Sequence, residues 1–415
     1  MRTGWREATL GELCTLRAGI AFKKTLQGQA TGDIPFIKVS DMNLPGNSCE
    51  IAVARNYLTV DQAAQIRAKP FPKETTVFAK IGEALRHNRV RLLQHETLID
   101  NNMMGAVPDS KVVLPRFLFY LLSTIDLGRL ATGTAVPYLT QSTLARIALA
   151  IPPLENQRSI ASTLSEFDAL AENIRKRLAV IEQLSELIYR EWFVHFRYPG
   201  RHPEKLVASP LGPIPAGWTV APLFDVAEVS FGYPFASAGF GQTGLYPVVR
   251  IRDVPKGTTE TFTNEEAGSR YEVHNGDTLV GMDGEFYLSR WCGGPSYLNQ
   301  RVARVRPSAD VEAQLLHLQL RAPLRALNQE ITGTTVAHLG KRHLEGIHLL
   351  VGDQEVMARA RQTLGPLGDL ALSLRRAALR LSALRDLLIP KLVSGQIDLA
   401  PPGSTGRVEA ERARA

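Results

Sequence analysis

The chain has 415 residues, 44% of them hydrophobic and 21% charged, so it holds enough apolar material for two or three packed domains and is not intrinsically disordered. Its formal net charge of +7 favours a polyanionic partner, although many basic proteins bind no nucleic acid. The N-terminal segment has no apolar signal region and no run approaches about 18 apolar residues, so we expect a cytoplasmic protein that spans no membrane.

The sequence contains a long internal repeat. Gly4-Trp5 returns as Gly217-Trp218 at an offset of 213 residues, and the segment 34–41 is echoed by 246–253. Further along, the loop 133–139 matches 333–339 at an offset of 200 residues. Because a match at a nearly fixed offset indicates one architectural unit used twice, we predict two similar domains.

Each copy begins with short strands and has a helix near its end. Enrichment in β-branched and aromatic residues predicts strands at 34–40, 76–81, 246–252 and 277–282. The spacing of apolar residues predicts helices over 114–130 and 311–327, each leading to a Gly-Thr loop. Each copy is therefore expected to form an α/β globular domain of roughly 150 residues.

The stretch 151–198 is predicted to be one long helix. Pro152 and Pro153 suit its first turn, and Pro199-Gly200 cannot continue it. Its apolar residues step by four and three in alternation, which is the seam of a heptad helix that needs a partner. The seam consists of Ile160, Leu164, Phe167, Ala171, Ile174, Leu178, Ile181, Ser185, Ile188 and Trp192.

A second heptad helix follows the second copy and is the expected partner. Pro366 and Gly368 leave its start uncertain in the sequence, and Pro390 should end or kink it. The leucine-rich residues predict the following seam: Leu367, Leu370, Leu374, Ala377, Leu381, Leu384 and Leu388.

These elements predict six consecutive segments. They are a first domain at 1–150, a central helix at 151–198, a linker at 199–216, a second domain at 217–352, a C-terminal helix at 353–398 and a disordered tail at 399–415. If the helices pair in opposite directions, they hold two similar domains about one turn of B-DNA apart, roughly 34 to 36 Å. They would equally serve only to stabilise a duplicated domain.

Taken together, this layout resembles the specificity subunit of type I restriction-modification systems. The resemblance covers residues 4–398 and is carried by IPPLENQ at 151–157, YREWFV at 189–194 and LIPKLVSGQI at 388–397. One departure is that LVGDQE at 350–355 replaces the Pro-Pro-Leu-Glu pattern before the second helix, which puts equal starts of the two helices in question.

The resemblance implies an α+β fold, with two target recognition domains separated by two long helices that pair as an antiparallel coiled coil about a pseudo-twofold axis. It implies a subunit that reads one half of a bipartite double-stranded DNA site with each domain and catalyses nothing alone. The implied partners are two methyltransferase subunits and, through the complex, a restriction and translocase subunit. S-adenosylmethionine, ATP and Mg²⁺ are expected only in those partners, and this chain is expected to hold no cofactor or metal.

Other motifs carry little chemistry. Residues 239–244 match GxGxxG, but a strand follows where a nucleotide-binding helix would be needed, so we predict a turn. The repeated Gly82-Glu83 and Gly284-Glu285 are also interpreted as turns, because a catalytic acid would need a paired carboxylate or metal ligands. The three cysteines, Cys14, Cys49 and Cys292, are isolated, which predicts reduced, packed thiols.

DNA reading requires Arg or Lys for phosphates and guanine, and Asn or Gln for adenine, on loops that reach a groove. The candidates of the first copy are Lys23, Lys24, Lys38, Arg86, His87, Asn88, Arg89, Asn101, Asn102 and Thr134. Those of the second copy are Arg250, Arg252, Arg290, Asn299, Gln300, Arg301, Thr334, Lys341 and Arg342. Any single one is more often a solvated residue or a phosphate contact than a base reader.

The helices offer candidate partner contacts. Trp192, Phe193 and Phe196 near the end of the first helix suit a partner-subunit interface, and packing against the neighbouring domain is an equal alternative. Two other functions stay open: a scaffold whose domains bind protein, and the recognition part of a fused restriction-methylation enzyme.

Overall fold

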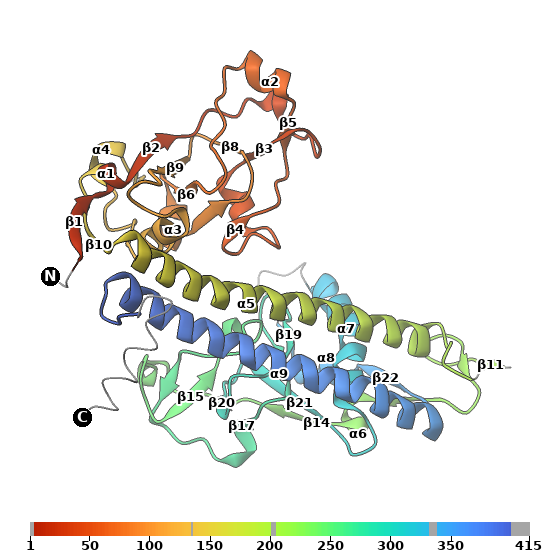
Figure 1. The fold of residues 1–415 in the computed structure, drawn as a ribbon. Coiled ribbons are helices and arrows are strands. Elements are labelled where there is room, and N and C mark those ends of the chain that lie inside the picture. Colours follow the sequence, from red (N-terminus) through yellow and green to blue (C-terminus); the bar gives the residue numbers. More distant parts are fainter. Residues whose placement is uncertain (1–3, 134–135, 201–204, 332–337, 400–415) are drawn as a thin grey trace, which may run out of the picture. The chain divides into compact units, whose positions relative to one another are not determined.

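The computed structural model describes residues 4–133, 136–200, 205–331 and 338–399 (Figure 1). The chain forms two compact units, unit 1 with residues 1–171 and 381–415 and unit 2 with residues 172–380. Two long helices, α5 (Leu154–Tyr189) and α9 (Gln354–Val393), contribute a segment to each unit. Each unit therefore draws on both halves of the sequence.

The globular domain of unit 1 contains two main sheets. One has the strand order β2-β9-β6-β7-β4 and the other the order β5-β3-β8, while β1 and β10 form an antiparallel pair that brings the start and end of the domain together. The strands are β1 (Arg6–Thr9), β2 (Cys14–Ala18), β3 (Ile34–Ile37), β4 (Glu50–Ile51), β5 (Tyr57–Leu58), β6 (Thr76–Ala79), β7 (Val90–Leu93), β8 (Leu98–Ile99), β9 (Met103–Pro108) and β10 (Ala148–Ile151). The α-helices are α1 (Leu10–Leu13), α2 (Val60–Gln65), α3 (Pro115–Ser123) and α4 (Gln141–Ala145).

The globular domain of unit 2 repeats this topology. Its main sheets have the orders β14-β21-β18-β19 and β16-β15-β20-β17, and β13 pairs with β22. The strands are β11 (Leu206–Val207), β12 (Ile214–Pro215), β13 (Thr219–Pro222), β14 (Ala227–Phe231), β15 (Tyr246–Val249), β16 (Phe262–Thr263), β17 (Glu272–Val273), β18 (Thr278–Gly281), β19 (Leu288–Arg290), β20 (Ser296–Leu298), β21 (Val302–Pro307) and β22 (His348–Val351). The α-helices are α6 (Leu223–Val226), α7 (Ala313–Ile331) and α8 (Lys341–Glu345).

The central strands are buried on both faces. Successive side chains of a strand point to opposite sides, so Val77 and Phe78 of β6 enter two different apolar clusters. Leu279 and Val280 of β18 divide in the same way. The equivalent packing confirms the prediction of two repeated domains in a fold that mixes helices and sheets.

The predicted strands exist but end early. The strands β3 and β15 stop at Ile37 and Val249, because each runs into a short 3₁₀ turn, η2 (Val39–Asn43) or η6 (Ile251–Asp253). Similarly, α3 ends at Ser123 rather than 130. The Asn88 side chain holds the following turn by donating to the carbonyl of Ile125 and accepting from the amide of Leu127, which diverts the chain from the helix.

Two predicted turns are also confirmed. Gly82 and Gly284 both have positive φ, 76° and 71°, which suits glycine in a turn. The segment 239–244 leads into β15, and Gly241 bridges to Phe262 of β16, so it is not a helix-forming nucleotide loop.

The two long helices pair in opposite directions within each unit. In unit 1, Asp168 of α5 pairs with Arg385 of α9 at 3.1 Å, and Ile160, earlier in α5, clusters with Val393, later in α9. In unit 2, Glu182 pairs with Arg375. The predicted α5 seam is confirmed, because every one of its ten residues from Ile160 to Trp192 is buried or half-buried.

The predicted α9 seam was out of phase. Leu370, Ala377 and Leu384 are exposed, while Ala371, Ala378 and Arg385 take the inward positions. The inward residues of α9 are Leu364, Leu367, Ala371, Leu374, Ala378, Leu381, Arg385, Leu388 and Leu392. Each lies 200 residues after a buried or half-buried residue of α5, so the repeat sets the phase and the most leucine-rich path does not.

The two helices start at equivalent residues despite their different sequences. Leu154 begins α5 and Gln354 begins α9, again 200 residues apart. Before α9, the carboxylate of Asp353 accepts the amide of Val356 at 2.9 Å, which caps the helix where α5 has Pro152-Pro153. Helix α9 also continues through Pro366 and Pro390 to Val393, so Pro390 does not end it. The predicted tail beyond residue 399 lies outside the described residues.

The remaining general expectations concern thiols and membranes. All three cysteines are free, Cys14 and Cys292 are buried, and burial raises the pKa of Cys14 to about 12. Among the described residues, no helix has the length and apolar character needed to cross a bilayer.

Candidate nucleic-acid interface

Two turns of unit 1 meet at one sheet edge and carry several predicted site residues. Strands β3 and β8 are parallel, with Ile37 opposite Ile99, so the turns that follow them emerge side by side. The amide of Asp100 donates to the carbonyl of Ile37 at 3.0 Å and joins the two turns. The structure therefore brings together Lys38 and the pair Asn101 and Asn102.

Unit 2 builds the same edge. Strands β15 and β20 are parallel with Val249 opposite Leu298, and the amide of Asn299 donates to the carbonyl of Val249 at 3.2 Å. We call Lys38, Arg55, Asn101 and Asn102 edge 1, and the equivalent group Arg250, Arg252, Gln300 and Arg301 edge 2.

Edge 1 combines a cation with amides. The Lys38 ammonium donates to Gln27 at 2.7 Å and lies 5.0 Å from the centre of the Phe22 ring. Asn101 and Asn102 are exposed, as are Lys23 and Lys24 on the neighbouring loop. Burial raises the pKa of the Asp100 carboxyl, which lies beneath this turn. Exposed amides beside a lysine match what a DNA-reading loop requires.

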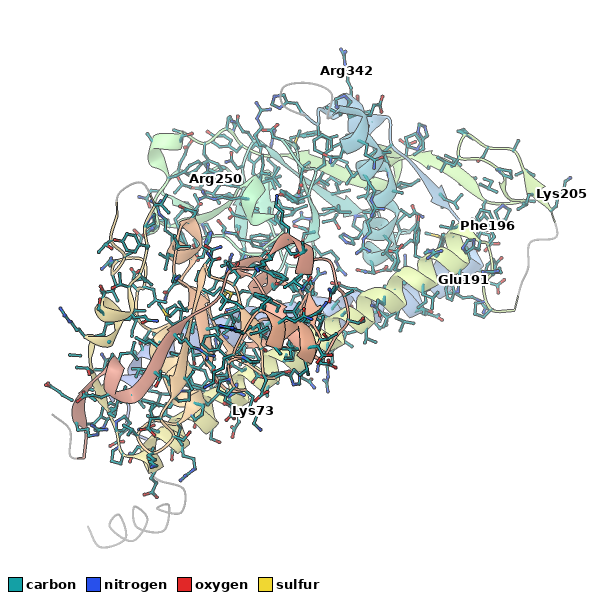
Figure 2. All side chains as sticks on the ribbon, turned by 90° about the horizontal axis from the view of Figure 1, so that it is seen from above. Lys73, Glu191, Phe196, Lys205, Arg250 and Arg342 are labelled. Carbon is teal, nitrogen blue, oxygen red and sulfur yellow. The ribbon has the colours of Figure 1, made fainter. Side chains whose placement is uncertain are left out.

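Edge 2 is richer in arginine. The Arg250 guanidinium lies 5.4 Å from the centre of the Phe240 ring, and Arg252 donates to Thr261 at 3.2 Å. Both arginines line an open groove of about 630 Å³. Figure 2 marks Arg250, and shows Arg342 projecting outward from α8.

A third loop adjoins each edge. In unit 1 the amide of Lys80 donates to the carbonyl of Asn102, and the amide of Leu139 to that of Lys80. In unit 2 Met282 makes the equivalent bonds with Arg301 and Leu339. The Gly-Thr loops therefore lead into the edges, but Thr134 and Thr334 themselves lie outside the described residues.

Other candidates of unit 2 are exposed but already paired. Arg301 lies 3.5 Å from Asp283, and Lys341 lies 3.3 Å from Glu345. The side chain of Asn299 accepts the amide of Gln300, which leaves Gln300 the more accessible of the two.

Arg290 was wrongly placed among the DNA-binding residues. Its side chain is buried, with the guanidinium 3.3 Å from both the carbonyl of Gly276 and the side chain of Gln314. Burial lowers its pKa, and it packs beside Gly368 of α9. Arg290 therefore joins the sheet to the helices of unit 2 and does not face a groove.

The cluster 86–89 is divided in the same way. Arg86 and His87 are exposed, and Arg86 lies 3.4 Å from Glu83. Asn88 is half-buried and uses its amide for the turn after α3, which corrects its prediction as a base reader, while Arg89 is half-buried beside it.

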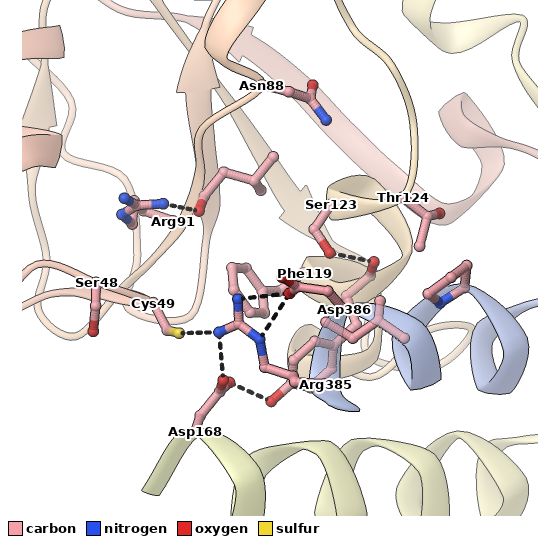
Figure 3. A pocket seen from close by; sticks show the side chains of 14 residues that line it. Ser48, Cys49, Asn88, Arg91, Phe119, Ser123, Thr124, Asp168, Arg385 and Asp386 are labelled. Atoms are coloured by element: carbon pink, nitrogen blue, oxygen red, sulfur yellow. Dashed lines mark hydrogen bonds and ion pairs between the residues drawn. The ribbon is translucent and has the colours of Figure 1, made fainter. Parts of the chain in front are cut away.

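A cavity of about 420 Å³ lies next to Asn88 in unit 1, between the domain and its helix segments (Figure 3). In it Arg385 donates to Asp168 at 3.1 Å and lies 3.6 Å from the sulfur of Cys49. Tyr120 donates to the other oxygen of Asp168 at 2.6 Å. Burial raises the pKa of Cys49 to about 11, so its thiol stays protonated near neutral pH.

The three aromatic residues predicted to bind a partner instead form part of the core. Trp192 and Phe193 are buried, and the Phe193 ring lies 5.6 Å from Trp218. Phe196 is half-buried and packs edge-on against the same tryptophan at 5.5 Å. The alternative of packing on the neighbouring domain is therefore correct for all three residues, of which Figure 2 labels Phe196.

The sequence contained a better signal for a docking surface. Leucines that lie outside the inward seam recur at the offset of 200 residues, and they are exposed by 42% to 55%. Unit 1 contains Leu170, Leu384 and Leu387, and unit 2 contains Leu370, Leu184 and Leu187. We call these groups leucine patch 1 and leucine patch 2.

Comparison with known proteins gives a consistent picture. Residues 2–183 and 215–352 match the family described as the type I restriction modification DNA specificity domain. The chain is 26% identical to the type I restriction enzyme MjaIX specificity subunit of Methanocaldococcus jannaschii, over 88% of this chain and 87% of that one. It is 21% identical to the HindI specificity subunit of Haemophilus influenzae, over 95% and 99% of the two chains.

The fold also matches a solved structure. The S subunit of a type I restriction-modification system from M. genitalium superposes with a TM-score of 0.61 at 16% identity, covering 94% of this chain and 96% of that one. The likeness in fold thus extends over both globular domains and both long helices.

Proposed function

Because this chain belongs to the family of type I restriction modification DNA specificity domains, we propose that it reads a bipartite DNA site, one half with edge 1 and the other with edge 2. As a specificity subunit it is a recognition component and not a catalyst. The chemistry of methylation and cleavage then belongs to other chains, which would bind S-adenosylmethionine, ATP and Mg²⁺.

The observation that carries this proposal is that the two edges are equivalent. Each unit presents a basic residue after one parallel strand and an amide pair or an amide with an arginine after the next, at the same sheet edge. Arg, Lys, Asn and Gln are the side chains that contact phosphates and base edges. The edges differ in composition, so the two half-sites should differ in sequence.

The leucine patches support the proposed partners. An exposed leucine on a helix is ordinary when it stands alone, but three such residues in each unit at matching positions suit an apolar contact. We propose that each patch docks one methyltransferase subunit, so that two bind per chain. The restriction and translocase subunit would join through that complex.

Binding of duplex DNA at increasing salt tests the proposal. The recognition sequence would first be taken from the methylated positions in the source genome, and the chain would then be titrated with that duplex and with a scrambled one. We expect preference for the split site and an affinity that falls with log salt by about 0.9 for each phosphate contact. A complex that assembles but has no preference for the site would favour a protein-binding scaffold.

A further inference from the structure

Each edge contains a buried aspartate at an equivalent place. Asp41 and Asp253 are 2% and 3% exposed. The carboxylate of Asp41 accepts the amide of Lys38 at 2.8 Å, and that of Asp253 accepts the amide of Arg250 at 2.9 Å. These bonds fix both carboxylates in the turn after the parallel strand.

An arginine lies beside each aspartate, but the two arginines come from different elements. The Nε atom of Arg55 lies 3.9 Å from the Oδ1 atom of Asp41, and the Nε atom of Arg252 lies 3.9 Å from the Oδ1 atom of Asp253. Their side chains are 68% and 62% exposed. Arg55 precedes β5, whereas Arg252 lies in the η6 turn itself.

The strand register shows that this is an exchange. Pro35 lies opposite Tyr57 in unit 1, and Pro247 lies opposite Phe262 in unit 2. Two residues before those partners, unit 1 has Arg55 and unit 2 has Glu260. In the turn, conversely, the position of Arg252 is held by Ser40 in unit 1. The guanidinium has kept its place while the residue that supplies it has changed.

We propose that Arg55 and Arg252 are equivalent specificity-determining residues, and that each reads a guanine in its own half-site. A guanidinium pairs with O6 and N7 of guanine through two parallel N–H groups, and an aspartate beside it restricts the orientation of those groups. In unit 2, Glu260 lines the same groove as Arg252 and would accept from N4 of the paired cytosine. This inference rests on the proposed function and names its chemistry.

A purely structural role for the arginines is less consistent with their exposure. An ion pair at 3.9 Å whose cation is about two-thirds exposed adds little to stability. In unit 1, Oδ1 of Asp41 accepts no hydrogen bond at all, so Arg55 is near the carboxylate without being spent on it. Its N–H groups stay available for an external acceptor.

The test uses the full chain and duplexes in which each base pair of the recognition sequence is replaced in turn. For Arg55→Gln we expect affinity for the intact site to fall roughly 5- to 150-fold, with discrimination lost at one base pair of one half-site. Arg252→Gln should do the same in the other half-site. Arg129→Gln and Arg325→Gln, at exposed arginines away from the edges, are the matched controls and should bind like the wild type.

Two further variants keep the test decisive. Arg55→Lys preserves the charge near Asp41, so it should fold even if Arg55→Gln does not, yet it should still lose discrimination because an ammonium lacks the planar fork. Combining Arg55→Ser with Ser40→Arg places the arginine where unit 2 has it, and should restore at least part of the lost discrimination.

Three results would overturn the inference: Arg55→Lys with wild-type discrimination, an equal loss on every duplex, or no rescue by the relocated arginine. An equal loss would identify a phosphate contact. If the wild-type chain itself shows no preference for the split site, the proposed function fails, whereas a wild-type preference that neither arginine variant alters rejects this inference alone.

Discussion

Arg290 and Arg301 show at the scale of single residues how burial decides what an arginine does. Both lie in the second copy near strand ends, and both are candidates from sequence because they are basic. Arg290 is 6% exposed and bonded to Gly276 and Gln314, whereas the side chain of Arg301 is 53% exposed. Sequence gives the residue type but not the depth, because depth depends on how α9 closes over β19.

We therefore expect Arg290→Ala to lower the free energy of unfolding by about 1 to 3 kcal/mol, since it leaves buried acceptors without a donor. Base preference should be unchanged. Arg301→Ala, the matched control, should alter stability by less than about 0.5 kcal/mol and weaken DNA binding. Thermal unfolding and duplex titration measure the two effects, and a stable Arg290→Ala chain with altered base preference would contradict the assignment.

His317 makes stability depend on pH. It is 4% exposed, and burial, followed by the charges of Arg321, Arg375 and Arg290, lowers its pKa to about 3. An unfolded histidine titrates near pH 6.5, so between that pH and about 3 the unfolded chain binds a proton that the folded chain does not. The contribution of His317 is therefore fully present above pH 6.5 and is lost as the pH falls.

Denaturation by urea at pH 7.5 and 5.5 tests this dependence. The wild type should lose about 1.4 kcal/mol more on acidification than His317→Gln, since the amide does not titrate. The difference between the two chains matters, because all other groups titrate in both. Equal losses would show that His317 is protonated in the folded state.

At the scale of the helices, phase decides which leucines are core. Sequence analysis found the α5 seam correctly, because there the apolar path and the inward path coincide. In α9 they diverge: Leu370 and Leu384 are exposed while Ala371 and Arg385 face inward. A rule that follows hydrophobicity alone has no reason to choose alanine and arginine over leucine, whereas the offset of 200 residues from α5 gives the right phase.

Leu381 and Leu384 provide a matched test of that phase on one helix. Leu381 is 9% exposed and Leu384 is 52% exposed. We expect Leu381→Ala to cost about 2 to 3 kcal/mol of stability and Leu384→Ala less than about 0.5 kcal/mol. Denaturant titration measures both, and similar costs would support the leucine-rich seam.

At the scale of the whole molecule, the repeat explains most of what sequence could predict. The two domains, the paired helices and the strands at 34, 76, 246 and 278 all follow from it. It could not reveal Arg55, because the exchange of Arg55 for Glu260 and of Ser40 for Arg252 removes the match that a repeat search uses. It could not distinguish a docking aromatic from a core one either, since Trp218 reaches Phe193 and Phe196 only after folding.

The two leucine patches predict a stoichiometry. Replacing Leu384 and Leu387 by glutamate puts charge on patch 1 without touching the seam, so the chain should fold and bind one methyltransferase subunit instead of two. Replacing Leu184 and Leu187 as well should abolish binding. Native mass spectrometry of the reconstituted complexes counts the subunits, and two bound subunits in the fully substituted chain would place docking elsewhere.

The sharing of both helices between the units has a consequence for biosynthesis. The core of the first domain includes Leu392 and Val393, which pack with Ile160. Those residues leave the ribosome more than 200 positions after the domain they complete, a delay of roughly 10 to 40 s at ordinary elongation rates. During that interval the nascent first domain exposes an unfinished apolar face, so chaperones should be needed most while the second half is still being translated.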